Sequence, residues 1–72
     1  MSLKDDITHL ADTRRTNFAV QLLRLYSKSA GPNRARLASA FPNAAAVYEA
    51  WQAAPDDSPE SVERYVPDLP YD

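Results

Sequence analysis

Proline is concentrated after residue 31 and limits the length of every helix in that part of the chain. The six prolines stand at positions 32, 42, 55, 59, 67 and 70. Because proline is tolerated in the first turn of a helix and disrupts it elsewhere, this spacing predicts several short helices rather than one long one. The single glycine and the twelve alanines also favour helix over sheet.

The part of the chain before Gly31 predicts two helices, at about residues 3–11 and at residues 16–29. Ser2 is a suitable capping residue for the first, which repeats apolar residues at helical spacing. Gly31 in a left-handed conformation, followed by Pro32, is expected to end the second helix. The apolar stripe expected on the second helix is Phe18, Ala19, Leu22, Leu23, Leu25 and Tyr26.

Three shorter helices are expected after Gly31. Asn33 is the expected cap of the first of them, which stops before Pro42. Pro42 then opens a helix at about residues 43–53, whose expected inner face is Ala44, Val47, Tyr48 and Trp51.

Ser58 followed by Pro59 predicts the start of a last helix at about residues 59–65. Its apolar residues, Val62 and Tyr65, are expected to be buried together with Val66. The fold prediction is therefore all-α, a compact bundle of four to five short helices. Residues 1–66 are expected to form one domain, followed by an extended, proline-containing tail at residues 67–72.

Charge is sorted along the chain, although the net charge is only −2. From Thr13 to Tyr48 there are six basic residues and no acid, whereas Glu49 to Asp72 contains seven acids and one base. Such sorting indicates a charged partner, or pairing of the acidic C-terminal segment with the basic middle. The basic residues of the middle segment are Arg14, Arg15, Arg24, Lys28, Arg34 and Arg36.

The sequence carries few groups with catalytic or metal-binding chemistry, so we expect a protein that is not an enzyme and has no cofactor or metal. His9 is the only histidine, there is no Cys, and Gly31 alone does not make a phosphate-binding loop. Asp56, Asp57 and Glu60 lack the spacing and the turn glycine of a calcium loop. No segment approaches the roughly 20 apolar residues of a membrane span. We therefore expect a cytoplasmic protein without a membrane partner.

The predicted function is non-catalytic protein binding through a helical surface, with a partner protein or with a second copy in a homodimer. Arg14, Arg24 and Lys28 are expected to face an acidic partner from the second helix. Trp51 is the expected apolar anchor, since Trp and Arg are favoured at interfaces. The alternative is nucleic-acid binding through the basic segment at residues 14–36. Against it, the helix after Pro42 carries no Lys or Arg with which to enter a groove.

Residues 33–42, with the sequence NRARLASAFP, are followed by Val47, Tyr48 and Trp51. This segment resembles a pattern in small uncharacterised phage and prophage proteins. The physical content of the pattern is a short capped helix, a bend at proline and a second helix. The resemblance carries over no site residue, and it implies an accessory protein that binds a host or phage macromolecule.

Overall fold

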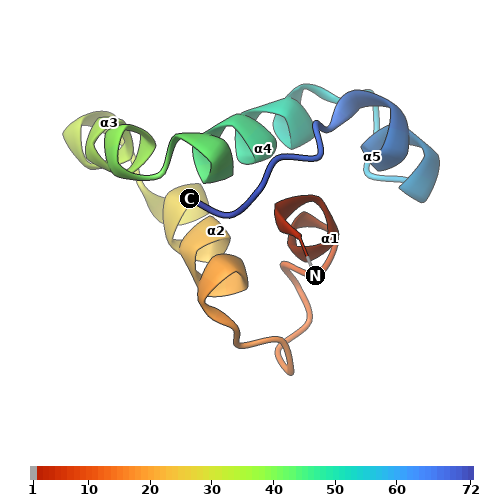
Figure 1. The fold of residues 1–72 in the computed structure, drawn as a ribbon, viewed down its shortest axis with the longest axis horizontal. Helices are drawn as coiled ribbons and strands as arrows, with labels where there is room; N and C mark the ends of the chain where they lie inside the picture. Colours follow the sequence, from red (N-terminus) through yellow and green to blue (C-terminus); the bar gives the residue numbers. More distant parts are fainter. Residues whose placement is uncertain (1) are drawn as a thin grey trace.

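The computed structural model describes residues 2–72 and is all-α, with no strand in that range, as the sequence predicts (Figure 1). The helices form one small globule with principal extents of 32 × 26 × 20 Å. In chain order they are α1 (Leu3–Ile7), α2 (Phe18–Lys28), α3 (Gly31–Ala40), α4 (Pro42–Ala53) and α5 (Pro59–Tyr65).

Helix α4 is the centre of the fold and packs against each of the other four helices (Figure 1). Its buried face consists largely of small side chains, which lets neighbouring backbones approach closely. Pro42 lies in its first turn, as predicted, because a first-turn residue needs no backbone N–H. The buried residues of α4 are Ala44, Ala45, Val47 and Tyr48.

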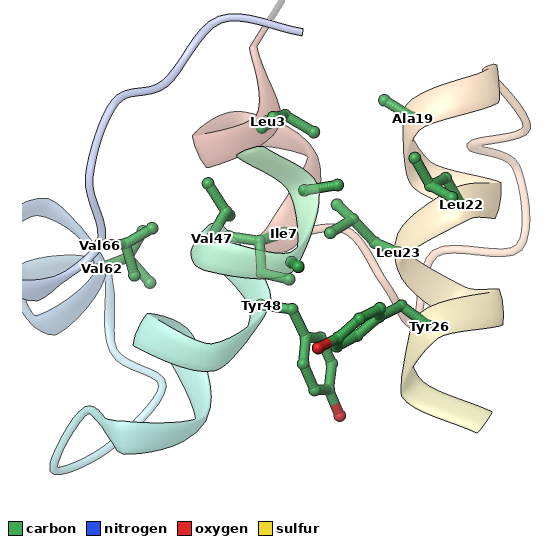
Figure 2. Packing of buried hydrophobic residues seen from close by; sticks show 12 residues of the cluster. Leu3, Ile7, Ala19, Leu22, Leu23, Tyr26, Val47, Tyr48, Val62 and Val66 are labelled. Carbon is green, nitrogen blue, oxygen red and sulfur yellow. The ribbon is translucent and has the colours of Figure 1, made fainter. Parts of the chain in front are cut away.

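The hydrophobic core lies where α1, α2 and α4 meet (Figure 2). Leu3, Ile7, Leu23 and Val47 are almost completely buried there. The Tyr26 ring meets the Tyr48 ring edge-on, with their centroids 5.2 Å apart. Val62 and Val66 close the core from the side of α5 (Figure 2).

Helix α1 ends at Ile7, not near residue 11 as predicted. Ser2 does cap its first turn, through a 3.1 Å bond from the Asp5 amide to Oγ. At the other end, the Asp5 carbonyl accepts from the Thr8 amide, the Thr8 hydroxyl and the His9 ring. These local bonds replace the i to i+4 bond that would continue the helix, and the chain passes into turns.

The buried side of α2 is rotated from the predicted stripe. Phe18 is 70% exposed and Leu25 is 54% exposed, whereas Val20, outside the stripe, is completely buried. The reason is tertiary: the turns after α1 lie over the side of α2 that carries Arg24, and Val20 is one turn earlier on the same side. The apolar pattern of one helix does not show that a loop will bury a second side of it.

Helix α3 begins at Gly31, so Asn33 is inside the helix and is not its cap. Gly31 does adopt the predicted left-handed conformation, with φ of 56°, but it does not end α2 as predicted. The C-cap of α2 is Ser29, in an extended conformation, and Gly31 is the first residue of α3. The N-cap is Ala30, and Pro32 occupies the first turn. No residue of α3 is fully buried, although Leu37 and Ala38 pack partly against the core.

Helix α5 has the predicted bounds, and the Ser58 hydroxyl caps it by accepting from the Ser61 amide at 3.2 Å. Val62 and Val66 are buried as predicted, but Tyr65 is half exposed. The tail is extended as predicted, and its last residues return to the other end of the chain. The Tyr71 hydroxyl donates to Asp6 Oδ2 at 2.9 Å, across 65 positions of sequence.

The Asp72 carboxylate caps helix α4. Its two oxygens accept from the Asn43 amide at 2.8 Å and the Ala44 amide at 2.9 Å. Phe41, the N-cap residue, provides no side-chain bond, so the tail supplies the missing acceptor. A negative charge at this helix end is also favoured by the helix dipole. The tail is therefore docked on α4 and Asp6, and not on the basic middle, which was one of the two alternatives drawn from the charge sorting.

Candidate functional site

The four residues predicted to bind a partner lie in different environments. The Arg14 side chain is 90% exposed and pairs with Asp12, Nε to Oδ1, at 3.2 Å. Lys28 is exposed in the last turn of α2 and forms no ion pair within residues 2–72. Trp51 lies on α4, partly buried, with its ring 5.9 Å from the Tyr48 ring. Arg24 is the residue whose position differs most from the expected exposed stripe.

The guanidinium of Arg24 is turned inward and holds the turns after α1. Nε donates to the Leu10 carbonyl at 2.8 Å, and Nη1 donates to the Arg15 carbonyl at 2.7 Å. Nη2 donates to the carbonyls of Asp12 at 2.5 Å and His9 at 3.4 Å. The rigid fork of guanidinium donors suits several carbonyls at once. Arg24 therefore stabilises the fold, and its donors are not presented to a partner.

Arg34 has a similar internal role at the end of α2. It donates to the carbonyls of Ser29 and Tyr26, both at 3.2 Å, at the helix C-terminus, where a cation is also favoured by the helix dipole. The guanidinium also stacks 4.9 Å from the centre of the Tyr26 ring and lies 3.6 Å from Glu49. Glu49 in turn accepts from the Tyr26 hydroxyl at 3.0 Å. Burial, reinforced by this bond to Glu49, raises the pKa of Tyr26.

Arg15 pairs with acids of the first helix. Its Nη1 lies 3.4 Å from Asp5 Oδ2 and 3.9 Å from Asp6 Oδ1. Asp6 is completely buried and also accepts from Asn17 and Tyr71, so its charge is compensated by a cation and two donors. Four of the six cations between Thr13 and Tyr48 thus have a partner within the molecule, either a carboxylate or a set of backbone carbonyls. They are Arg14, Arg15, Arg24 and Arg34.

The sequence reasoning missed an apolar groove of about 320 Å³ beside the N-terminal turn of α2. We call it the Phe18 groove. The rings of Phe18 and Phe41 form one wall, with centroids 6.0 Å apart, and the tail forms another. The sequence analysis placed Phe18 in the apolar stripe that was expected to be buried. The one feature of the sequence that could have indicated its exposure is its position at the very start of the helix. The groove is lined by Leu3, Asn17, Phe18, Ala19, Leu22, Phe41, Tyr71 and Asp72.

One polar atom in the wall of the Phe18 groove lacks a partner. The Asn17 amide nitrogen donates to Asp6 Oδ1 at 3.3 Å, but its Oδ1 is buried without a hydrogen bond in the described chain. Buried acceptors are normally satisfied, so this oxygen is an exception in the described part of the chain. Beside it, partial burial and the bond to Asp6 raise the pKa of the Tyr71 hydroxyl.

No group of three or more His, Asp or Glu side chains among residues 2–72 is arranged to hold a metal ion. In the same range, no helix has the length and apolar character needed to cross a membrane. Comparisons with models of known families, with curated proteins and with solved structures found no match to this chain.

Proposed function

We propose that this chain is a non-catalytic protein-binding module that uses the Phe18 groove as its contact surface. The observation that carries the proposal is the 70% exposure of Phe18 at the edge of an apolar groove. The chain has few large apolar side chains, and leaving one of them in water forgoes about 1.5–3 kcal/mol of burial. An apolar side chain of a partner would recover that contribution by covering the Phe18 and Phe41 rings.

The alternative, nucleic-acid binding through residues 14–36, has less support. Phosphate binding needs several cations presented together to solvent. Arg24 and Arg34 direct their donors to backbone carbonyls, and Arg14 and Arg15 have carboxylate partners. Within residues 2–72, Lys28 and Arg36 are the cations of that segment with neither a carboxylate nor a backbone carbonyl as partner, which is a small electrostatic footprint.

The identity of the partner stays a prediction. The resemblance of residues 33–42 to phage and prophage proteins favours a host or phage protein, in the cytoplasm. A second copy is the other predicted occupant. Trp51 lies on α4 outside the Phe18 groove and would contribute only if the interface extended along that helix.

The proposal is tested with immobilised chain in extracts of the cells that produce it. We expect Phe18→Ser to lower retention of a specific partner at least tenfold. The matched control is Tyr65→Ser, which removes a half-exposed aromatic ring on α5, outside the Phe18 groove, and should leave retention unchanged. Equal retention by both variants, or no specific retention by the original chain, would contradict the proposal.

Self-association is measured on the isolated chain by sedimentation from micromolar to millimolar concentration. A dimer through the Phe18 groove would dissociate in Phe18→Ser and persist in Tyr65→Ser. An 8.0 kDa species throughout would exclude the homodimer.

A further inference from the structure

A second surface, separate from the Phe18 groove, lies between the outer sides of α2 and α3. We call it the α2–α3 surface. It is a hollow of about 400 Å³ lined by Leu25, Lys28, Ser29, Asn33, Arg36 and Leu37. A neighbouring hollow of about 330 Å³ shares Leu25 and Lys28 and continues toward Gln21 and Thr16. The residues that line the two hollows run from Thr16, just before α2, to Leu37 on α3, and Leu25 belongs to both.

The α2–α3 surface combines exposed apolar area with uncompensated positive charge. Leu25 is 54% exposed, and Leu37 is only partly covered. Lys28 has no carboxylate partner within residues 2–72, and Arg36 Nη1 donates only to the neutral Asn33 Oδ1, at 3.0 Å. No acid contributes to either hollow.

The contrast with the other cations points to an external anion. Arg14, Arg15 and Arg34 each have a carboxylate close by, and Arg24 has four carbonyls. Of the acids in the last third, Glu49 already pairs with Arg34 and Asp72 caps α4, and none of the others forms an ion pair with Lys28 or Arg36 within residues 2–72. They are therefore not placed to neutralise the α2–α3 surface within one molecule.

We infer that the α2–α3 surface binds an acidic amphipathic helix of a partner protein. Leu25 and Leu37 supply the apolar contacts of this surface, and an amphipathic helix presents apolar side chains one turn apart that fit such contacts, as in helix-in-groove recognition. Apolar residues of the partner pack on either side of Leu25, and its Asp or Glu residues approach Lys28 and Arg36. Complementary charge sets the orientation and the selectivity, while the apolar contacts supply most of the affinity.

The test uses a designed 14-residue helical peptide as probe, with Leu at positions one turn apart and Glu on both flanks. Its titration into the isotope-labelled chain is followed by NMR. We expect saturable shifts of amides on the facing sides of α2 and α3. The same peptide with Lys in place of Glu should bind at least tenfold more weakly.

Charge reversal at the surface provides the decisive variants. Lys28→Glu with Arg36→Glu should lose the acidic peptide at least tenfold and gain the lysine peptide. The matched control is Arg14→Glu with Arg64→Glu, which changes net charge equally at exposed residues outside the surface and should retain binding within about twofold. Backbone spectra of each variant establish that the fold is kept.

Four outcomes would overturn the inference: no saturable shifts at millimolar peptide, equal binding of both peptides, equal loss in the control variant, or shifts confined to the Phe18 groove.

Two further titrations identify other occupants. Concentration-dependent shifts of α2 and α3 without peptide would assign the surface to a second copy. Shifts of the same amides by duplex DNA, with none from the peptide, would assign it to nucleic acid. The Phe18→Ser variant should bind the acidic peptide normally, so failure here leaves the proposed function intact.

Discussion

The loop at residues 8–17 and the tail at residues 67–72 are both irregular, and groups of opposite charge hold them in place. The loop presents carbonyls, and the Arg24 guanidinium on α2 donates to four of them. The tail presents a carboxylate, and Asp72 accepts from two amides at the start of α4. The loop has backbone carbonyls that need donors, and a cation supplies them. The start of α4 has amides that need acceptors, and a carboxylate of the tail supplies them.

The two segments differ in where their stabilising group comes from. Arg24 of α2 donates to the loop, so the loop depends on a side chain that is distant in sequence. The tail contacts the start of α4 and Asp6 through Asp72 and Tyr71, so its order depends on its own last two side chains. Loss of the loop contacts should thus destabilise the body of the fold, whereas loss of the tail contacts should mainly release the tail.

Arg24→Gln is the change from which we expect the largest effect. It removes several charge-assisted bonds to carbonyls of the loop, so the free energy of unfolding should fall by about 2–4 kcal/mol. Urea unfolding followed by the fluorescence of Trp51 measures it. Arg24→Lys should recover less than half, because an ammonium group cannot span the four carbonyls.

Arg14→Gln serves as the comparison, since it removes an exposed arginine from the same part of the molecule. Its effect should stay within about 0.5 kcal/mol, as expected for an exposed ion pair. If Arg24→Gln were no more destabilising than Arg14→Gln, the role assigned to Arg24 in holding the loop would be wrong.

Asp72→Ala should have a smaller effect, a loss of about 1 kcal/mol, which is typical of a missing helix cap. Hydrogen exchange of the Asn43 and Ala44 amides should accelerate, because both lose their acceptor. Asp68→Ala removes another tail carboxylate, one without a helix-end contact, and should change neither measurement. Equal changes in the two variants would show that general charge, and not capping, holds the tail.

Tyr71→Phe should have the smallest effect at neutral pH, below about 1 kcal/mol, and a distinct dependence on alkaline pH. Burial and the Asp6 bond raise the pKa of Tyr71 above its ordinary value of 10.0. The stabilisation is therefore fully present below pH 10 and is lost as pH rises through the higher pKa of the folded state.

Stability of the original chain should accordingly decline above pH 10, and Tyr71→Phe should make that decline shallower. Some alkaline loss should persist in the variant because the pKa of Tyr26 is raised as well. An identical pH profile in both proteins would be evidence against the bond between Tyr71 and Asp6.

Local sequence signals predicted most of the helices because their causes are local. Pro42, Ser58 and Pro59 define helix starts by steric and hydrogen-bonding effects within one turn, and α4 and α5 begin where they indicate. Gly31 adopts the left-handed conformation that its lack of Cβ permits. The error at α1 also has a local cause, since Thr8 and His9 compete for the Asp5 carbonyl, but helical periodicity does not report such competition.

The candidate site was less accessible to sequence reasoning. Phe18 and Leu25 fit an amphipathic pattern equally well whether they are covered or exposed, and only the packing of α1, α4 and the loop decides which. Likewise, Arg24 and Lys28 occupy the same predicted polar face. Arg24 turns toward the loop carbonyls, while Lys28, one turn later, has no such neighbours.

By itself, the sequence determined an all-α chain of short helices and a concentration of cations in its middle, because both follow from residue types and their spacing. Tertiary structure alone decided which cations are used internally and which are left at the surface. The reason is that carbonyls, carboxylates and helix ends from distant segments become neighbours only after packing. The same packing seats the tail on α4 and leaves Phe18 and Leu25 as the exposed apolar residues from which function is proposed.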